Sequence, residues 1–397
     1  MLFLDPWFWR FAVIAIIGYW IVPRPAKLVW LITSSAFFHY HFAGPAGVIP
    51  IIFLGVFTYF TGLRLAKEPG RPLFLVALTM LAGALGFYKY SAFLLGDAGI
   101  AAGAVFGPAS VSWLTEWENP VPPLAISFFT FEFVHYLYEV KARGGAPIRN
   151  PLHFTLFAIF FPTLASGPIK RYADFVPQLE RLRNPSVARV WAGAQRVVLG
   201  LFKKICLADL LVEFIQAIER TPVYTPHLIA VLAMLQGFRI YFDFAGYSDM
   251  AIGLAEMLGL KVPENFDRPY RSTSLQDFWR RWHMSLSLWI RDYIYIPLGG
   301  NQGRRHLHIL FAMGICGLWH GAAWNFLAWG VYHGLGLGIE AATKARFPEL
   351  FAAGRAISFL RWFVCYSYVS YGWLFFFYPM AEVIQMNQEA YQWCFAG

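Results

Sequence analysis

The stretch LVWLITSSAFFHYHFAGPAGVIPIIFLGVFTYFTGL, which runs from Leu28 to Leu63, decides the fold class of this chain. It contains 36 residues without an Asp, Glu, Lys or Arg. About 20 apolar residues cross the roughly 30 Å hydrocarbon core of a bilayer, so the stretch fits two passes, or one pass and a re-entrant segment. It is apolar on both faces, whereas membrane β-strands alternate in polarity. We therefore expect membrane helices.

Other runs of the same kind extend this prediction along the chain. The longest has 34 uncharged residues, from His306 to Ile339, and two others have 20 residues each, at 150–169 and 362–381. This spacing predicts an all-α polytopic membrane protein with about ten to twelve membrane segments. Helices are expected near residues 8–22, 28–43, 47–66, 72–95, 124–140, 188–219, 226–260, 307–340 and 355–378.

Composition excludes most other classes of protein. The 397 residues are 58% hydrophobic and only 14% charged, against about 25% charged residues in soluble domains. The net charge of +9 does not indicate nucleic-acid binding, because the basic residues form short clusters between apolar runs, as in cytoplasmic loops that face anionic lipid. With no internal repeat and no linker, we expect one membrane domain over residues 1–397.

Several templates for metal or cofactor chemistry are missing from the sequence. The four cysteines are far apart and form no CxxC pair, and no HExxH, GxSxG or Walker motif occurs. His306, His308, His320 and His333 lie close together in sequence, but their spacing is irregular. We expect no metal site and no bound cofactor.

The segment 150–177 differs from the other apolar stretches because Pro162, Gly167 and Pro168 interrupt it. Proline removes a backbone hydrogen bond and breaks a helix. Broken backbone at membrane depth needs protein or a water-filled cavity to satisfy its polar groups. We expect a re-entrant segment beside a cavity here.

His320 is the first candidate for chemistry, because it lies near the middle of the 34-residue uncharged run. Ionisable groups inside a membrane are costly and usually functional. A neutral imidazole can act as a general base near neutral pH. The alternative is a buried structural histidine that is bonded to a backbone carbonyl.

His283 is the second candidate, on a charged helix that we expect to begin after Ser274 as its N-cap. This helix is predicted to lie in or just below the membrane interface, with Trp279 and Ser287 on the same face as His283. Guanidinium groups beside an imidazole suit a phosphate or carboxylate on a bulky donor; the alternative is a helix that binds lipid headgroups. The flanking arginines are Arg280, Arg281 and Arg291.

Several long motifs resemble those of the membrane-bound O-acyltransferase family. They are NFDRPY at 265–270, FWRRWHMSLS at 278–287, WIRDYIYIPLGGN at 289–301 and LWHGAAW at 318–324, with shorter pieces at 160–169 and 174–179. The resemblance implies a ring of tilted helices around a central funnel, with re-entrant and interfacial helices. It also implies that His320 is the principal catalytic histidine and His283 the second signature residue. Tentative substrate contacts are Trp279, Arg280, Arg281, Ser287, Arg291, Trp319, Trp324 and Asn325.

Within the family, the chain is most similar to bacterial members that acylate cell-envelope polysaccharides. The stretch 295–301 resembles the alginate O-acetylation branch, and 161–168 with 364–367 the teichoic acid D-alanylation branch. This implies transfer of an acetyl group, or alternatively D-alanyl, from a cytoplasmic thioester to an extracytoplasmic hydroxyl. The implied donor is acetyl-CoA or a phosphopantetheine acyl carrier protein. The implied partners are membrane lipids and an SGNH-like acyl-transfer protein, at the bacterial cytoplasmic (inner) membrane.

A second class of function is a non-enzymatic transporter or lipid channel. His320 and Asp243 would then be proton-relay residues, although the inverted repeats common in transporters are not visible. A simpler role for Asp243 is a structural ion pair, for which Arg239, four residues earlier, is the candidate partner.

Overall fold

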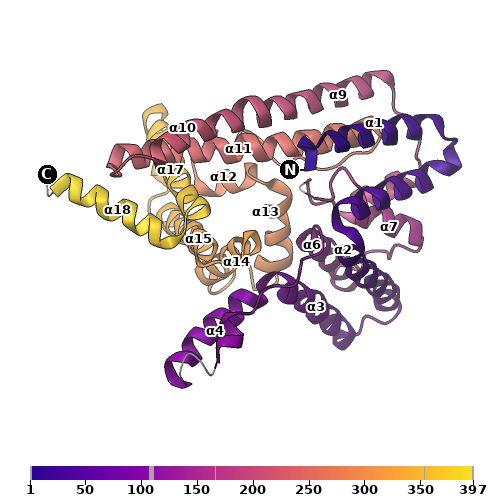
Figure 1. Ribbon diagram of the computed structural model, residues 1–397, viewed down its shortest axis with the longest axis horizontal. Helices are drawn as coiled ribbons and strands as arrows, with labels where there is room; N and C mark the ends of the chain where they lie inside the picture. Colours follow the sequence, from indigo (N-terminus) through magenta and orange to yellow (C-terminus); the bar gives the residue numbers. More distant parts are fainter. Residues whose placement is uncertain (1, 107–110, 166, 353, 396–397) are drawn as a thin grey trace. The chain divides into compact units, whose positions relative to one another are not determined.

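The computed structural model describes residues 2–106, 111–165, 167–352 and 354–395, and within them every regular element is a helix (Figure 1). The chain forms two compact units, one made of residues 1–197 and 250–263 and the other of residues 198–249 and 264–397. The boundary falls within α9 (Val187–Leu201) and α11 (Pro226–Met257). Ser166, in the predicted re-entrant segment, lies outside the described residues.

Two helices of the first unit, α1 (Pro6–Ile21) and α7 (Pro151–Ile159), begin at side-chain caps. Asp5 accepts a hydrogen bond of 2.8 Å from the backbone of Trp7, and Asn150 accepts one of 2.9 Å from Leu152. A proline follows each cap at the first helical position, where its missing N–H costs nothing. The helices are α1 (Pro6–Ile21), α2 (Lys27–Lys67), α3 (Arg71–Leu85), α4 (Ser91–Phe106), α5 (Ser112–Thr115), α6 (Ile126–Ala142), α7 (Pro151–Ile159) and α8 (Tyr172–Leu179).

Helix α2 is two helices joined at a sharp bend. Gly44 has φ +60° and ψ −178° inside it, and Pro45 follows. A positive φ favours glycine, and proline tolerates the first turn of the new helix. The bend therefore separates the two helices that the sequence predicts at 28–43 and 47–66.

The segment after α7 is non-helical but well buried. Phe160 and Phe161 are fully buried, and the Phe161 N–H donates to Ser35 Oγ at 3.2 Å. Lys170 forms a 2.6 Å ion pair with Glu132 and donates to Thr163 Oγ1 at 2.9 Å. Protein groups thus satisfy the Phe161 N–H and the buried Lys170 charge. The re-entrant position of the segment beside a cavity stays a prediction.

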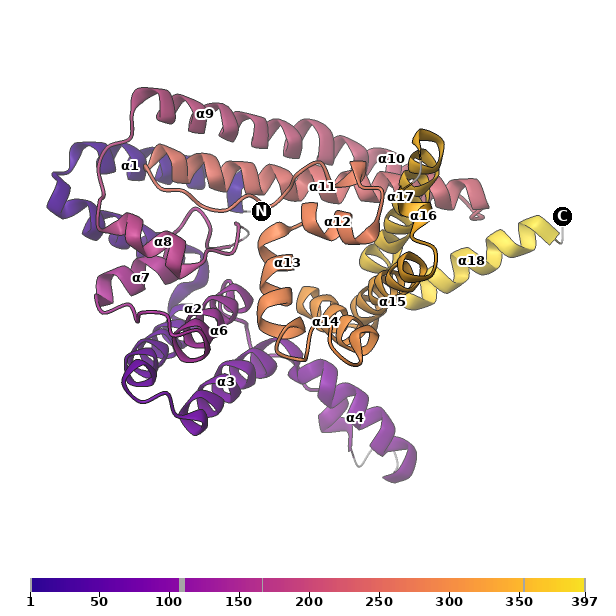
Figure 2. The same cartoon turned by 180° about the vertical axis from the view of Figure 1, so that it is seen from behind.

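The second unit contains the helices that carry both candidate histidines. In Figures 1 and 2, α14 and α15 lie side by side, and α12 leads into α13. The helices are α10 (Asp209–Glu219), α12 (Leu275–Arg281), α13 (Met284–Ile290), α14 (Arg305–His320), α15 (Trp324–Arg346), α16 (Glu349–Ala352), α17 (Arg355–Phe377) and α18 (Met380–Phe395).

Helices α14 and α15 approach closely through glycines. A Cβ on Gly317 would lie 2.2 Å from the Phe326 carbonyl oxygen, and one on Gly330 would lie 2.2 Å from the Met313 carbonyl oxygen. Only residues without a side chain fit there, as in membrane helix pairs that pack through small residues. The sequence places one helix over 307–340, whereas the structure has two, because the chain turns back between residues 321 and 323.

Three stretches of the described residues are long and apolar enough to cross a membrane, at Arg24–Lys67, Arg71–Val105 and Pro226–Met257. Apolar side chains such as Ile52, Phe60 and Val105 are more than half exposed on the first two, which suits contact with lipid. The second stretch continues from α3 into α4 through a π-helical segment (Gly86–Tyr90), so it is longer than the helix predicted at 72–95. The predicted ten to twelve spans stay a prediction.

Candidate active site

His320 is the last residue of α14, and its ring lies among aromatic side chains. The helix stops there because Gly321 takes an extended conformation, with φ −165°. The His320 ring centroid is 4.7 Å from that of Trp319 and 5.2 Å from that of Trp329. Phe376 of α17 contributes a third ring at 5.0 Å. Three rings restrict the imidazole while the residue stays half-buried.

His283 occupies the junction of α12 and α13 and is 1% exposed. Its φ is +40°, a left-handed conformation that is strained for histidine and that concentrates at functional sites. This corrects the sequence analysis, which places His283 on one continuous helix face with Trp279 and Ser287. The predicted helix does begin after Ser274, whose Oγ accepts the Asp277 N–H at 3.1 Å. It ends at Arg281.

Asn265 fixes the proton on the His283 ring. Its Oδ1 atom accepts bonds from the Ser285 N–H at 3.3 Å and the Ser285 hydroxyl at 2.6 Å. Because a backbone N–H can only donate, this atom is the amide oxygen. It lies 3.3 Å from His283 Nδ1, which therefore carries the proton. The Asn265 amide nitrogen donates to Ser248 at 3.2 Å.

The other ring nitrogen of His283 is a free hydrogen-bond acceptor. With Nδ1 protonated, Nε2 holds a lone pair. It is buried and has no hydrogen-bond partner among the described residues. Phe244 packs edge-on against the ring at 4.6 Å.

Trp319 links the two histidines. Its ring centroid is 6.1 Å from that of His283 and 4.7 Å from that of His320. Both imidazoles therefore line one aromatic region of the second unit. All three residues belong to the motifs at 278–287 and 318–324, and the structure brings them together.

A third histidine of the same unit, His333, packs against two of the tryptophans around the site. His333 is fully buried, and neither ring nitrogen has a hydrogen-bond partner among the described residues. Its ring is 5.3 Å from Trp279 and 5.0 Å from Trp329. The described residues hold no group of three or more His, Cys, Asp or Glu side chains that could bind a metal.

Two of the arginines selected from the sequence already have acidic partners. Arg281 Nε lies 3.0 Å from Asp277, and Arg281 Nη1 lies 3.1 Å from Asp267. Arg291 pairs with Asp292 at 2.7 Å. Arg280 is exposed.

The remaining selected residues have diverse surroundings. Asn325 donates to the Phe375 carbonyl at 3.1 Å, which ties α15 to α17. Ser287 donates to the Trp282 carbonyl at 3.0 Å. Trp324 is 57% exposed at the start of α15.

Asp243 forms a structural ion pair, but with a different cation from the one predicted. Lys204 Nζ lies 2.7 Å from Asp243 and 2.6 Å from Asp209. Arg239 instead contacts Gln236 at 3.3 Å and the Phe377 ring at 5.1 Å. Lys204 is on the π-helical segment Phe202–Ala208, so its approach to α11 depends on tertiary packing that sequence spacing does not reveal.

Residues 128–381 match the family model described as MBOAT, membrane-bound O-acyltransferase family. This match contains both candidate histidines and every element around them. The chain belongs to the membrane-bound O-acyltransferase family. It is therefore a membrane protein and an acyltransferase, which confirms the family resemblance and the reaction class expected from the motifs.

Curated relatives of this membrane-bound O-acyltransferase are named for three different polymers. The chain is 36% identical to the probable alginate O-acetylase AlgI of Azotobacter vinelandii, over 90% of this chain and 71% of the relative. It is 31% identical to the peptidoglycan O-acetyltransferase of Helicobacter pylori, over 95% of this chain and 77% of the relative. The teichoic acid D-alanyltransferase of Streptococcus thermophilus is 32% identical, over 55% of this chain and 57% of the relative.

Proposed function

We propose that this protein transfers an acetyl group from a cytoplasmic thioester to a hydroxyl on the far side of the bacterial cytoplasmic membrane. The final acceptor is a polysaccharide, reached directly or through an SGNH-like partner protein. The observation that carries the proposal is the pair of histidines beside Trp319, one of which presents a bare, buried Nε2. Matches over 90% and 95% of this chain are to an alginate O-acetylase and a peptidoglycan O-acetyltransferase, which favours acetyl.

In the proposed reaction, His320 accepts the proton of the acceptor hydroxyl as that oxygen attacks the thioester carbonyl carbon. A C–O bond forms, the C–S bond breaks, and the leaving thiolate takes up the proton. His283 cannot donate to the oxyanion through Nε2 while Asn265 holds the proton on Nδ1. It therefore acts only as an acceptor, for a donor group of the substrate other than the reacting hydroxyl, and in this way positions the substrate. The aromatic rings around both histidines keep water from hydrolysing the donor.

The remaining site residues that we propose are Trp319, which lies between the histidines, and Trp279, which packs on His333. Arg280, Arg281, Ser287, Arg291, Trp324 and Asn325 complete the proposed set of substrate contacts. No bound cofactor or metal is proposed; the thioester is a substrate.

The direct test is acetyl transfer by the purified chain in lipid nanodiscs. Acetyl-CoA should be consumed, with free thiol released, when a soluble alginate or peptidoglycan fragment or a purified SGNH-like partner is added. Denatured protein and the His320→Ala variant are the controls. A protein that leaves acetyl-CoA intact but consumes D-alanyl carrier protein would support the alternative, D-alanyl transfer to a teichoic-acid-like polymer. Consumption of neither thioester would overturn the proposal.

A further inference from the structure

A polar cavity of about 280 Å³ lies in the second unit where the N-terminal end of α12, the C-terminal half of α15 and α17 meet. Its walls include two cations, one carboxylate and three other residues that can contact a ligand. They are Lys344, Arg361, Glu340, Ser274, Gln276 and Phe351. Neither candidate catalytic histidine lines this cavity.

The carboxylate in the cavity already accepts two hydrogen bonds from backbone N–H groups. Glu340 accepts the backbone N–H of Leu275 at 2.5 Å and that of Gln276 at 3.2 Å. These are free N–H groups of the first turn of α12, which need an acceptor. Glu340 therefore serves as a second cap for this helix, beside Ser274.

The two cations are not paired with a carboxylate in the part of the chain that the structure describes. Neither Lys344 nor Arg361 forms an ion pair with a carboxylate among the described residues. The Arg361 guanidinium is held in place, because it stacks on the Phe351 ring at 4.6 Å and donates to the Phe351 carbonyl at 3.1 Å. The Lys344 ammonium group lies over the same Phe351 ring, at 5.9 Å. The cavity thus presents a planar guanidinium and an ammonium group beside one aromatic residue.

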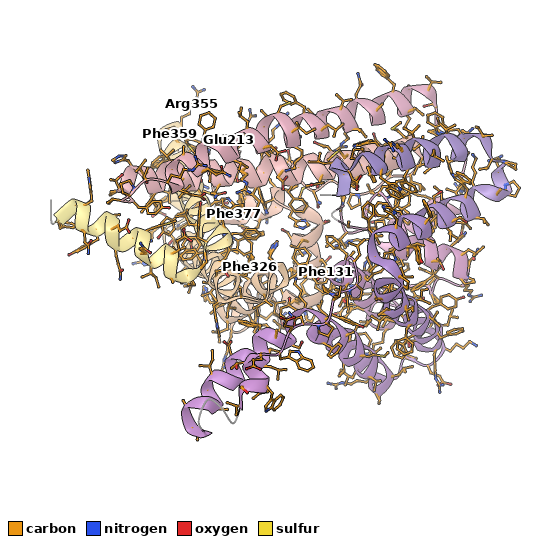
Figure 3. The ribbon with its side chains drawn as sticks, in the orientation of Figure 1. Phe131, Glu213, Phe326, Arg355, Phe359 and Phe377 are labelled. Carbon is orange, nitrogen blue, oxygen red and sulfur yellow. The ribbon has the colours of Figure 1, made fainter. Side chains whose placement is uncertain are left out.

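The segment beside the cavity carries the charge of a cytoplasmic loop. Lys344 and Arg346 lie in the last turn of α15, Arg355, labelled in Figure 3, begins α17, and Glu349 is the one charged residue between them. Short loops rich in Lys and Arg face the cytoplasm. Acyl thioester donors are made on that side and carry phosphate esters, in coenzyme A and in phosphopantetheine carriers alike.

From these observations we infer that the cavity at Lys344 and Arg361 binds a phosphate ester on the cytoplasmic face. The phosphate belongs either to the acyl thioester donor or to an anionic lipid headgroup. Guanidinium and ammonium groups are the usual ligands of phosphate, the guanidinium as a fork and the ammonium as a point charge. The Gln276 amide and the Ser274 hydroxyl offer further donors. The donor form of this inference rests on the proposed function.

The experiment compares two acetyl donors that differ in their phosphates. Acetyl-CoA carries them, and S-acetyl-N-acetylcysteamine carries none. In nanodiscs of the full chain, Arg361→Met should raise KM for acetyl-CoA about tenfold, and Lys344→Met should raise it about threefold, with kcat within twofold. KM for the short thioester should not change. Arg361→Lys, which keeps the charge, should recover part of the loss.

Arg346→Met is the matched control, because Arg346 is in the same last turn of α15 as Lys344, lies 5.3 Å from the neighbouring Phe347 ring and does not line the cavity. It should leave both KM values unchanged. Equal increases of KM for both donors in the cavity variants would overturn the inference, since the short thioester has no phosphate to lose.

A binding measurement keeps the site testable apart from activity. Stabilisation of the protein against heat is measured with coenzyme A, and separately with phosphatidylglycerol in place of phosphatidylcholine. Loss of coenzyme A stabilisation in Lys344→Met assigns the site to the donor, and loss of phosphatidylglycerol stabilisation alone assigns it to lipid. If coenzyme A and phosphatidylglycerol both stabilise Lys344→Met as much as the wild type, the inferred phosphate site is wrong. If the wild type transfers no acetyl group, the proposed function fails, but this measurement still decides the site.

Discussion

Asn265 and His283 form the central polar contact of the candidate site, with Asn265 Oδ1 3.3 Å from His283 Nδ1. Asn265 is fully buried, and its backbone carbonyl also accepts the Met284 N–H at 2.9 Å. The residue therefore supports the backbone on one side of His283 and fixes the proton on its ring. This arrangement resembles a base oriented by a third group.

Replacing Asn265 should slow the reaction more than it weakens binding. Asn265→Leu removes the acceptor, so the ring is no longer held in one tautomer, and we expect kcat to fall about 10- to 100-fold with little change in KM. Asn265→Asp keeps an acceptor and should be less affected. Ser248→Ala is the control, because it removes only the contact to the amide nitrogen. A kcat within threefold of wild type in Asn265→Leu would refute the positioning role.

His320→Ala should reduce acetyl transfer by about 10²–10⁴-fold, the usual effect of losing a general base. Thermal unfolding should stay close to that of the wild type. His308→Ala on the same helix is the control, since His308 bonds the Gly300 carbonyl at 3.0 Å and does not contact the aromatic region. More than about a tenth of wild-type turnover in His320→Ala would make His320 structural.

Gly330→Ala should separate α14 from α15. The new methyl group would overlap the Met313 carbonyl oxygen, and overpacking of this kind costs about 1–3 kcal/mol. We expect a lower unfolding temperature together with reduced turnover, because α14 carries His320. Gly338→Ala on the same helix meets only His306, at 3.4 Å, and should be neutral or stabilising. Equal stability of the two variants would contradict the close packing.

Lys170 and Glu132 should stabilise the folded protein only when both are present. The side chains are 2% and 6% exposed, and loss of one partner leaves a buried charge, at about 3–5 kcal/mol. Lys170→Met should therefore unfold at a lower temperature, measured in the same detergent as the wild type. The double variant Lys170→Met/Glu132→Leu should recover most of the loss. A double variant no more stable than the single one would show that the charges are not coupled.

The loop between α6 and α7 should face the cytoplasm, because it contains Arg143 and Arg149 and follows Lys141 in the last turn of α6. Ala146 is exposed there, whereas a side chain on Gly145 would overlap the Tyr172 hydroxyl. With Cys206 and Cys394 changed to Ser, Ala146→Cys should react with an impermeant thiol reagent in inverted vesicles. Reaction in intact spheroplasts would reverse the topology and the proposed direction of transfer.

The sequence by itself determined the features that depend on local chemistry. Uncharged runs identify helices that can lie in a membrane, and Ser274 marks the start of α12 through its own hydroxyl. The Gly44–Pro45 pair separates two helices. The LWHGAAW and FWRRWH motifs point to His320 and His283. An ionisable group or an arginine cluster in an apolar sequence can be recognised without knowledge of the tertiary structure.

Tertiary structure alone decided the contacts between residues far apart in the chain. Asn265 is 18 residues before His283, and nothing in its spacing indicates that it holds the ring. Asp243 pairs with Lys204 and not with Arg239 of its own helix, because the π-helical segment that carries Lys204 packs against α11. His283 leaves the helix only because the chain turns there with a positive φ. Such features depend on how closely two helices approach, and that distance is set by buried side-chain volume across the interface, which one-dimensional periodicity does not contain.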